Sequence, residues 1–166
     1  MAGFFQSLST IWQLAVPYFR SEDRWPGRVL LAGVIATELG LVLITVLLNQ
    51  WYNAFYNALQ DHSWDRFAVQ LVYFCGIAVA ATLVNAYKLY LNQWLEIRWR
   101  RWMTKRYLDR WLEGPTHYRM QLLGDRADNP DQRIAEDIKL FIERTLFVGV
   151  GLLGAIVSLA SFVVIL

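Results

Sequence analysis

Three long apolar blocks dominate the pattern of hydrophobic and polar positions along this chain. They cover residues 29–48, 67–87 and 145–166. Thr37 and Glu38 interrupt the first block, and the other two hold no charged residue. Each block has about the 20 residues that a helix needs to cross a hydrocarbon core of ~30 Å. The pattern therefore predicts an all-α fold, a polytopic membrane bundle with three transmembrane helices.

Residues 1–24, before the first block, show a different pattern. Their apolar side chains recur at helical spacing and form a single stripe. Its members are Phe4, Phe5, Leu8, Ile11, Trp12, Ala15, Val16 and Phe19. No basic residue precedes Arg20 and no small-residue cleavage site is present, which argues against a signal peptide. We expect an amphipathic helix that lies along the membrane surface, with Pro17 bending its end.

The second apolar block continues into a polar region without a helix breaker. Neither Pro nor Gly occurs between Lys88 and Leu112. A single helix over residues 67–112 would measure ~69 Å at 1.5 Å per residue, about twice the hydrocarbon thickness. Its apolar residues fall on two sides, which predicts helical neighbours on both. These residues are Leu95, Trp99 and Trp102 on one side, and Ile97, Leu108 and Trp111 on the other.

A helix break and a new start follow this arm. Gly114 and Pro115 end the first helix, and Asn129 offers an N-cap directly before Pro130. Asp131 suits the positive end of the helix dipole, and Gln132 can reach back as in a capping box. No proline follows up to Leu166, so the returning helix runs into the third block. Residues 88–144 thus form two helical arms joined by a tip at about residues 113–130.

Basic residues are distributed unevenly about the three blocks. Three of the 16 Lys and Arg precede the first block, one lies between the first and second, and twelve lie between the second and third. Fifteen of the sixteen therefore lie on one side, and the positive-inside rule puts that side in the cytoplasm. We expect a cytoplasmic N-terminus and an external segment at residues 49–66, where Trp51 and Tyr52 belong to an interfacial aromatic belt.

Composition agrees with a membrane protein. Hydrophobic residues make up 56% of the chain and charged residues 18%, against about 45–50% and 25% in a typical soluble domain. The chain stops at the end of the third block, which suggests a piece of a longer protein. The single Cys75 cannot form an internal disulfide and is interpreted as a small buried hydrophobe.

Glu38 is the most suggestive single residue. A carboxylate in mid-span costs ~2.5–3.5 kcal/mol on insertion scales, so such a residue faces protein or a polar pathway. Two interpretations remain open. Glu38 lines a translocation route or takes up protons, or it is a protonated, hydrogen-bonded structural group.

Two further motifs have simpler explanations than their usual functions. Residues 149–154 match G-x-G-x-x-G, but they lie inside a membrane span with no preceding strand. The small residues there instead favour close helix packing; they are Gly151, Gly154, Ala155, Ser158 and Ser161. The basic and aromatic run at 98–110 lies next to a span on the positive side, so we expect the lipid bilayer, not nucleic acid, as its partner.

The sequence supplies no catalytic or metal-binding constellation. It holds no G-x-x-x-x-G-K-[ST] motif and no Ser, His and Asp arrangement. His62 and His117 lie far apart, without acidic or Cys neighbours at ligand spacing. We therefore expect no enzyme activity, no metal and no cofactor in the chain itself.

The region of the tip resembles a known family. The run from Asn129 to Ile138, NPDQRIAEDI, is similar to the signature of the ABC transporter transmembrane region in YddA-type bacterial half-transporters and peroxisomal fatty-acyl transporters. The run from Trp51 to Leu59, WYNAFYNAL, and the aromatic and basic positions at 98–111 are similar to the same bacterial group. The related SbmA/BacA proteins have a similar membrane region but use a proton gradient.

This resemblance implies the first half of an exporter-type transmembrane domain. The complete protein is then a homodimer of six-helix subunits in a bacterial inner membrane, each with a fused domain that binds ATP and Mg. The tip contacts that domain through a set of coupling residues: Asn129, Pro130, Asp131, Gln132, Arg133, Glu136 and Asp137. The expected function is the permease part of an ATP-driven transporter. The alternatives are a proton-driven peptide transporter of the SbmA/BacA kind, with Glu38 as the proton site, and a membrane scaffold without transport.

Overall fold

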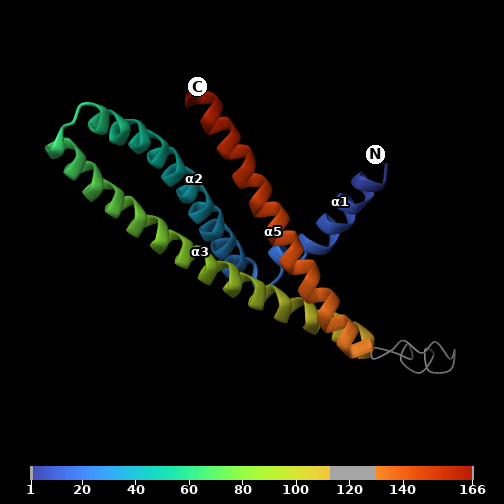
Figure 1. Cartoon of the computed structure of the whole chain (residues 1–166). Coiled ribbons are helices and arrows are strands. Elements are labelled where there is room, and N and C mark those ends of the chain that lie inside the picture. Colours follow the sequence, from blue (N-terminus) through green and yellow to red (C-terminus); the bar gives the residue numbers. More distant parts are fainter. Residues whose placement is uncertain (1, 113–129, 166) are drawn as a thin grey trace. The chain divides into compact units, whose positions relative to one another are not determined.

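The computed structural model describes residues 2–112 and 130–165, and every element in them is helical. The N-terminal helix α1 covers Ala2–Ala15, and the 3-10 helix η1 covers Tyr18–Arg20. Three long helices follow, α2 at Arg24–Gln60, α3 at Trp64–Leu112 and α5 at Pro130–Ile165 (Figure 1). The predicted all-α class is confirmed.

The three long helices match the predicted membrane spans. Each is long and apolar enough to cross a membrane. Few residues of their most apolar windows are buried inside the chain: 17% in α2, none in α3 and 11% in α5. Most of this apolar surface therefore faces outward, where lipid or other transmembrane helices can cover it.

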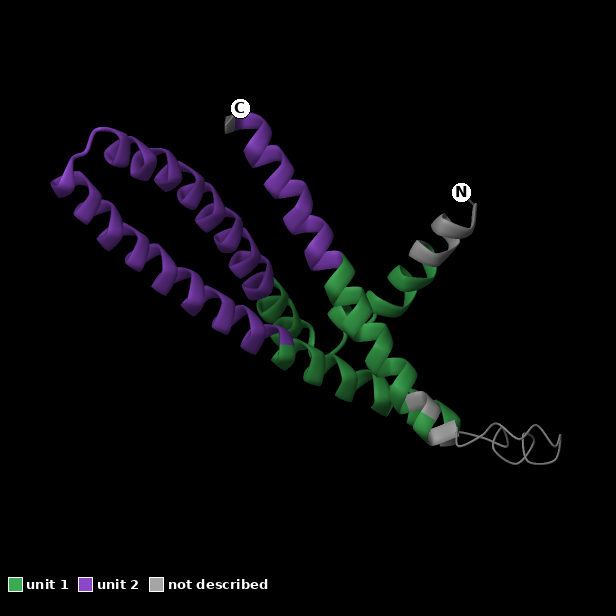
Figure 2. Cartoon of the chain, viewed as in Figure 1, with its two compact units in different colours: residues 1–31, 93–148 green, residues 32–92, 149–166 purple. Residues whose placement is uncertain are grey.

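The described residues fall into two compact units. The first unit contains Met1–Leu31 and Gln93–Val148, and the second contains Ala32–Asn92 and Gly149–Leu166 (Figure 2). The first unit thus holds the polar arm of α3 and the first part of α5. The second holds their apolar parts.

An aromatic cluster forms the core of the first unit. Tyr18 is fully buried and stacks on Trp99, with ring centroids 5.5 Å apart and planes 11° apart. Phe19 and Phe141 meet the same indole edge-on. Trp102 also contacts Tyr18. On the predicted packing side of α3, Trp99 is therefore covered by η1 and α5, Trp102 contacts η1, and Leu95 is buried.

Two further contacts attach the segment around η1 to its neighbours. Asp23 pairs with Arg98 of α3 at 3.3 Å. A Cβ on Gly27, at the start of α2, would lie 2.9 Å from the Tyr18 ring, so only glycine fits there. Burial raises the pKa of the Tyr18 hydroxyl, and the nearby Asp23 raises it further. Tyr18 is therefore a neutral core residue.

The second unit contains a helical hairpin of α2 and α3. A Schellman motif ends α2: the Ser63 amide donates to the Ala58 carbonyl and the His62 amide to the Leu59 carbonyl, each at 3.2 Å. His62 takes the left-handed conformation that this motif requires, with φ 50°. The α3 helix begins directly afterwards at Trp64.

Contacts along the hairpin define its antiparallel register. The Trp51 indole donates to the Gln70 carbonyl at 2.8 Å, and Phe55 packs on Phe67. Further from the turn, Val84 lies 3.7 Å from the Cβ position of Gly40. The helix α2 therefore continues through most of the predicted external segment 49–66, and only the short turn at 61–63 is non-helical.

Candidate functional site

Glu38 of α2 and Lys88 of α3 form an ion pair within the second unit. The Glu38 side chain is 14% exposed and that of Lys88 is 34% exposed. Within the described part of the chain, Glu38 is thus turned toward protein, and its charge is balanced locally. The two charges of a pair shielded from water attract each other more strongly, but both also lose hydration, so the removal of one partner alone is costly.

The third long helix reaches the same place. Gly154 of α5 is buried, and a Cβ built there would fall on the Glu38 carboxylate, 3.1 Å from its Cδ. The absence of a side chain at Gly154 is therefore what lets α5 approach this carboxylate. All three long helices meet at the Glu38, Lys88 and Gly154 cluster.

Lys88 is the residue that sequence reasoning did not connect with Glu38. It directly follows the second apolar block, whereas Glu38 lies in the middle of the first. The hairpin register nevertheless puts the two at one level. Lys88 therefore supplies the opposite charge that lowers the cost of the Glu38 carboxylate inside a span.

The small-residue face predicted on α5 is divided into two halves. Gly154 is buried and Ser158 and Ser161 are half-buried, but Gly151 and Ala155 are exposed. No atom lies within 4 Å of the Cβ position of Gly151. The predicted close packing is thus present at Gly154 and absent at Gly151, because the two residues lie about 60° apart around the helix. The G-x-G-x-x-G run is helical throughout.

The expectation that Cys75 is a buried hydrophobe is wrong for the described residues. It lies on an exposed part of α3, not in a packed core. Its neighbours Phe74 and Ile77 face the hairpin partner instead, since Phe74 contacts Trp51 and Ile77 is buried. Cys75 is one residue from Phe74 and two residues from Ile77, so its thiol points to another side of the helix.

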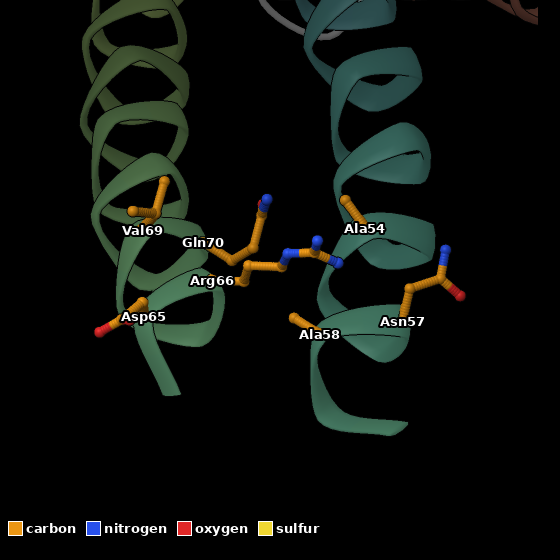
Figure 3. A pocket seen from close by; sticks show the side chains of 7 residues that line it. All are labelled: Ala54, Asn57, Ala58, Asp65, Arg66, Val69 and Gln70. Carbon is orange, nitrogen blue, oxygen red and sulfur yellow. The ribbon is translucent and has the colours of Figure 1, made fainter. Parts of the chain in front are cut away.

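A hollow of about 410 Å³ lies near the turn of the hairpin. Figure 3 shows the Arg66 side chain reaching from α3 toward Ala54 and Ala58 of α2, with Gln70 beside it. Arg66 pairs with Asp61 at 3.1 Å, and both side chains are more than half exposed. This surface pair closes the turn and offers no unbalanced charge.

The predicted coupling residues are described only in part. Helix α5 begins at Pro130, as the capping signals predicted. Gln132 donates to Glu136 at 3.0 Å, and Glu136 and Asp137 are exposed. Asn129 and the tip at 113–129 lie outside the described residues, as do the side chains of Asp131 and Arg133.

Comparison with known proteins identifies the family. The family model for ABC transporter transmembrane region 2 matches residues 14–166. The chain belongs to this family. The match includes all three long helices and the run from Asn129 to Ile138 that carried the resemblance.

Curated relatives agree with this assignment. The chain is 37% identical over 155 residues to the inner membrane ABC transporter ATP-binding protein YddA of Escherichia coli, covering 92% of this chain and 28% of that protein. It is 36% identical to the chloroplastic ABC transporter D family member 2 of Arabidopsis thaliana, covering 93% of this chain and 22% of that protein. An ABC transporter ATP-binding protein of Haemophilus influenzae is 30% identical, covering 80% of this chain and 22% of its own length. No solved structure matches the chain.

The chain therefore spans only about a quarter of the length of these relatives. It is a membrane-embedded permease part of an ABC transporter. The Glu38, Lys88 and Gly154 cluster lies within this permease part.

Proposed function

We propose that the full-length protein is an ATP-driven transporter of a bacterial inner membrane, to which this chain contributes the first half of the permease. The relatives' names support this proposal, since they describe ATP-binding proteins and, for the Escherichia coli relative, the inner membrane. An ATP-binding domain that uses Mg then lies in the remaining part of the protein. Two six-helix subunits form the pathway.

The proposed orientation has the N-terminus and the arms of α3 and α5 in the cytoplasm. Its support is the distribution of Lys and Arg, fifteen of sixteen on one side. The hairpin turn at 61–63, with the aromatic residues of the predicted belt nearby, then lies at the external surface. This orientation directs the coupling tip toward cytoplasmic ATP.

The two arms are proposed to transmit motion from the ATP-binding domain. Within the first unit Trp99 of α3 packs on Phe141 of α5, and Arg100 lies 3.9 Å from Glu143. Ile142 and Leu146 are buried in the same core. Arms packed in this way can carry a displacement of the tip as one body. The coupling surface consists of Asn129, Pro130, Asp131, Gln132, Arg133, Glu136 and Asp137.

The Glu38, Lys88 and Gly154 cluster is proposed to control how the three spanning helices separate as the pathway opens. Its support is that one carboxylate touches both other helices, through an ion pair and through a glycine. A proton-driven transporter would instead use Glu38 as its titrating group. The ion pair with Lys88 gives Glu38 a partner on the neighbouring helix, which supports a structural role over proton uptake.

One experiment tests how transport is energised. The full-length protein in proteoliposomes should hydrolyse ATP in a Mg-dependent and vanadate-sensitive manner. A preparation that is folded but hydrolyses no ATP, and that responds only to a pH gradient, would contradict the proposal in favour of the SbmA/BacA-like alternative. A protein that responds to neither would support the scaffold.

A further inference from the structure

A hollow of about 780 Å³ lies between η1 and the polar arm of α3, within the first unit. Five basic side chains line it: Arg20 from the η1 side, and Arg101, Lys105, Arg106 and Arg110 from α3. The hollow is therefore bounded by cations from two separate elements. Such an arrangement can surround a small anion instead of merely adding charge to one helix face.

The cations of the hollow are not neutralised by neighbouring carboxylates. Among the described residues, neither Arg20, Arg101 nor Lys105 forms an ion pair. Arg106 lies over the Trp102 ring, 5.1 Å from its centroid. That contact orients the guanidinium without cancelling its charge.

Three carboxylates also line the hollow, but the net charge of its lining remains positive. Asp23 is already paired with Arg98, which lies outside the lining. Glu22 and Asp109 remain against five cations. The net charge of the lining is therefore positive, and the ligand that balances it is an anion.

The hollow lies at the level where the first membrane span begins. Tyr18 contacts Gly27 at the start of α2 and stacks on Trp99 of α3, so these three residues share one level. Arg101 follows Trp99 within one turn, and the first apolar block begins just after Gly27. The headgroup layer adds roughly 5–7 Å to each side of the hydrocarbon core. A bilayer whose hydrocarbon core begins at residue 29 would place its phosphates beside Arg20 and Arg101.

We infer that this hollow binds a phosphate group, presented by the headgroup of an anionic phospholipid of the cytoplasmic leaflet. Arg20 and Arg101 contact the phosphate oxygens from opposite walls, and Lys105 adds a third donor. The exposed apolar side chains Ile11 and Trp12 of α1 lie on the same unit and suit contact with acyl chains. The bound lipid fixes η1 against α3. This inference does not depend on how transport is energised.

The test measures lipid binding to the purified full-length protein in detergent by native mass spectrometry. The probes are short-chain phosphatidylglycerol, short-chain phosphatidylcholine and inorganic phosphate. Phosphatidylglycerol should bind saturably, and about tenfold more tightly than phosphatidylcholine. The double variant Arg20→Gln with Arg101→Gln should weaken phosphatidylglycerol binding about tenfold or more, because it removes two charge-assisted hydrogen bonds to the phosphate.

A matched control removes two cations outside the hollow. Arg66→Gln with Lys139→Gln makes the same change in net charge and should leave binding within about twofold of the parent protein. Both variants should keep the parent's elution volume and thermal midpoint, since all four side chains are exposed.

Three results would overturn the inference. Equal losses in the site and control variants would show that only net charge matters. Equal affinity for the two lipids would show that the site does not select anionic headgroups. Displacement of the lipid by inorganic phosphate at comparable concentration would identify a soluble phosphate compound as the ligand instead.

Discussion

At the scale of single residues, Glu38 shows what position along one helix can and cannot reveal. Its carboxylate inside an apolar block predicted a protein-facing side chain, and the structure turns it toward α3 and α5. Its partner could not be read from the sequence alone. Pairing with Lys88 depends on the hairpin register, and that register is set by where the turn at 61–63 closes.

Removal of only one member of the ion pair should destabilise the protein more than removal of both. Lys88→Met leaves the mostly buried Glu38 carboxylate without its partner, with an expected cost of about 2 kcal/mol. The double variant Glu38→Gln with Lys88→Met should recover most of that loss. The thermal midpoints of the parent protein, the two single variants and the double variant, measured in detergent, give the coupling between the two residues. Additive effects of the two changes would show that the pair is not coupled.

Gly154 offers a second test of the same cluster. Gly154→Ala should displace the Glu38 carboxylate and lower the free energy of unfolding by about 1 kcal/mol. The control Gly151→Ala adds a methyl group in open space and should stabilise the helix by up to about 1 kcal/mol. In a Glu38→Ala background, Gly154→Ala should no longer lower the free energy of unfolding. If it still did, a group other than the Glu38 carboxylate would clash with the added methyl group.

At the scale of elements, the sequence predicted the long helices better than their ends. The run without Pro or Gly after Lys88 correctly predicted one continuous α3, and Pro130 correctly marked the start of α5. The end of α2 was missed. The sequence predicted residues 49–66 only as an external segment, whereas residues 49–60 continue α2. The helix propensities of their amide and aromatic side chains are only a few tenths of a kcal/mol poorer per residue, and the Trp51 contact with α3 outweighs this.

The turn of the hairpin holds His62 in an unfavourable backbone conformation. His62 has φ 50°, a conformation that costs a non-glycine residue roughly 1 kcal/mol. His62→Gly should therefore raise the thermal midpoint, and the β-branched His62→Val should lower it. Asp61 and Arg66 remain unchanged in both variants. If both substitutions moved the midpoint in the same direction, the left-handed conformation would not be the cause.

At the scale of the whole molecule, the chain leaves most of its spanning surface uncovered. Apart from Ile77, the most apolar window of α3 is not buried by the described residues, and Cys75 is exposed there. Sequence periodicity could not distinguish contact with lipid from contact with further helices, because both are apolar. The remaining part of the protein, or a second subunit, is expected to cover part of this surface.

Topology can be checked by labelling single cysteines in intact cells. In a full-length protein with Cys75→Ala and no other cysteine, an impermeant maleimide should label Ser63→Cys, at the hairpin turn. It should not label Arg110→Cys until the membrane is opened. The reverse pattern would place the arms outside and refute the proposed orientation.

The central claim is that ATP acts through the cytoplasmic arms on the spanning helices. It can be measured without a known substrate, as the maleimide labelling rate of Ser158→Cys in the full-length protein with all other cysteines replaced. Ser158 is half-buried on the packed side of α5, next to the turn that carries Gly154. Mg-ATP with vanadate should change this rate several-fold.

A variant of the tip provides the decisive comparison. Asn129→Ala with Gln132→Ala weakens the start of α5 by about 1 kcal/mol, too little to unfold the protein. ATP hydrolysis should persist in this variant, while the labelling rate of Ser158→Cys should no longer respond to ATP. A labelling rate that ignores ATP in the parent protein, while hydrolysis proceeds, would contradict the account.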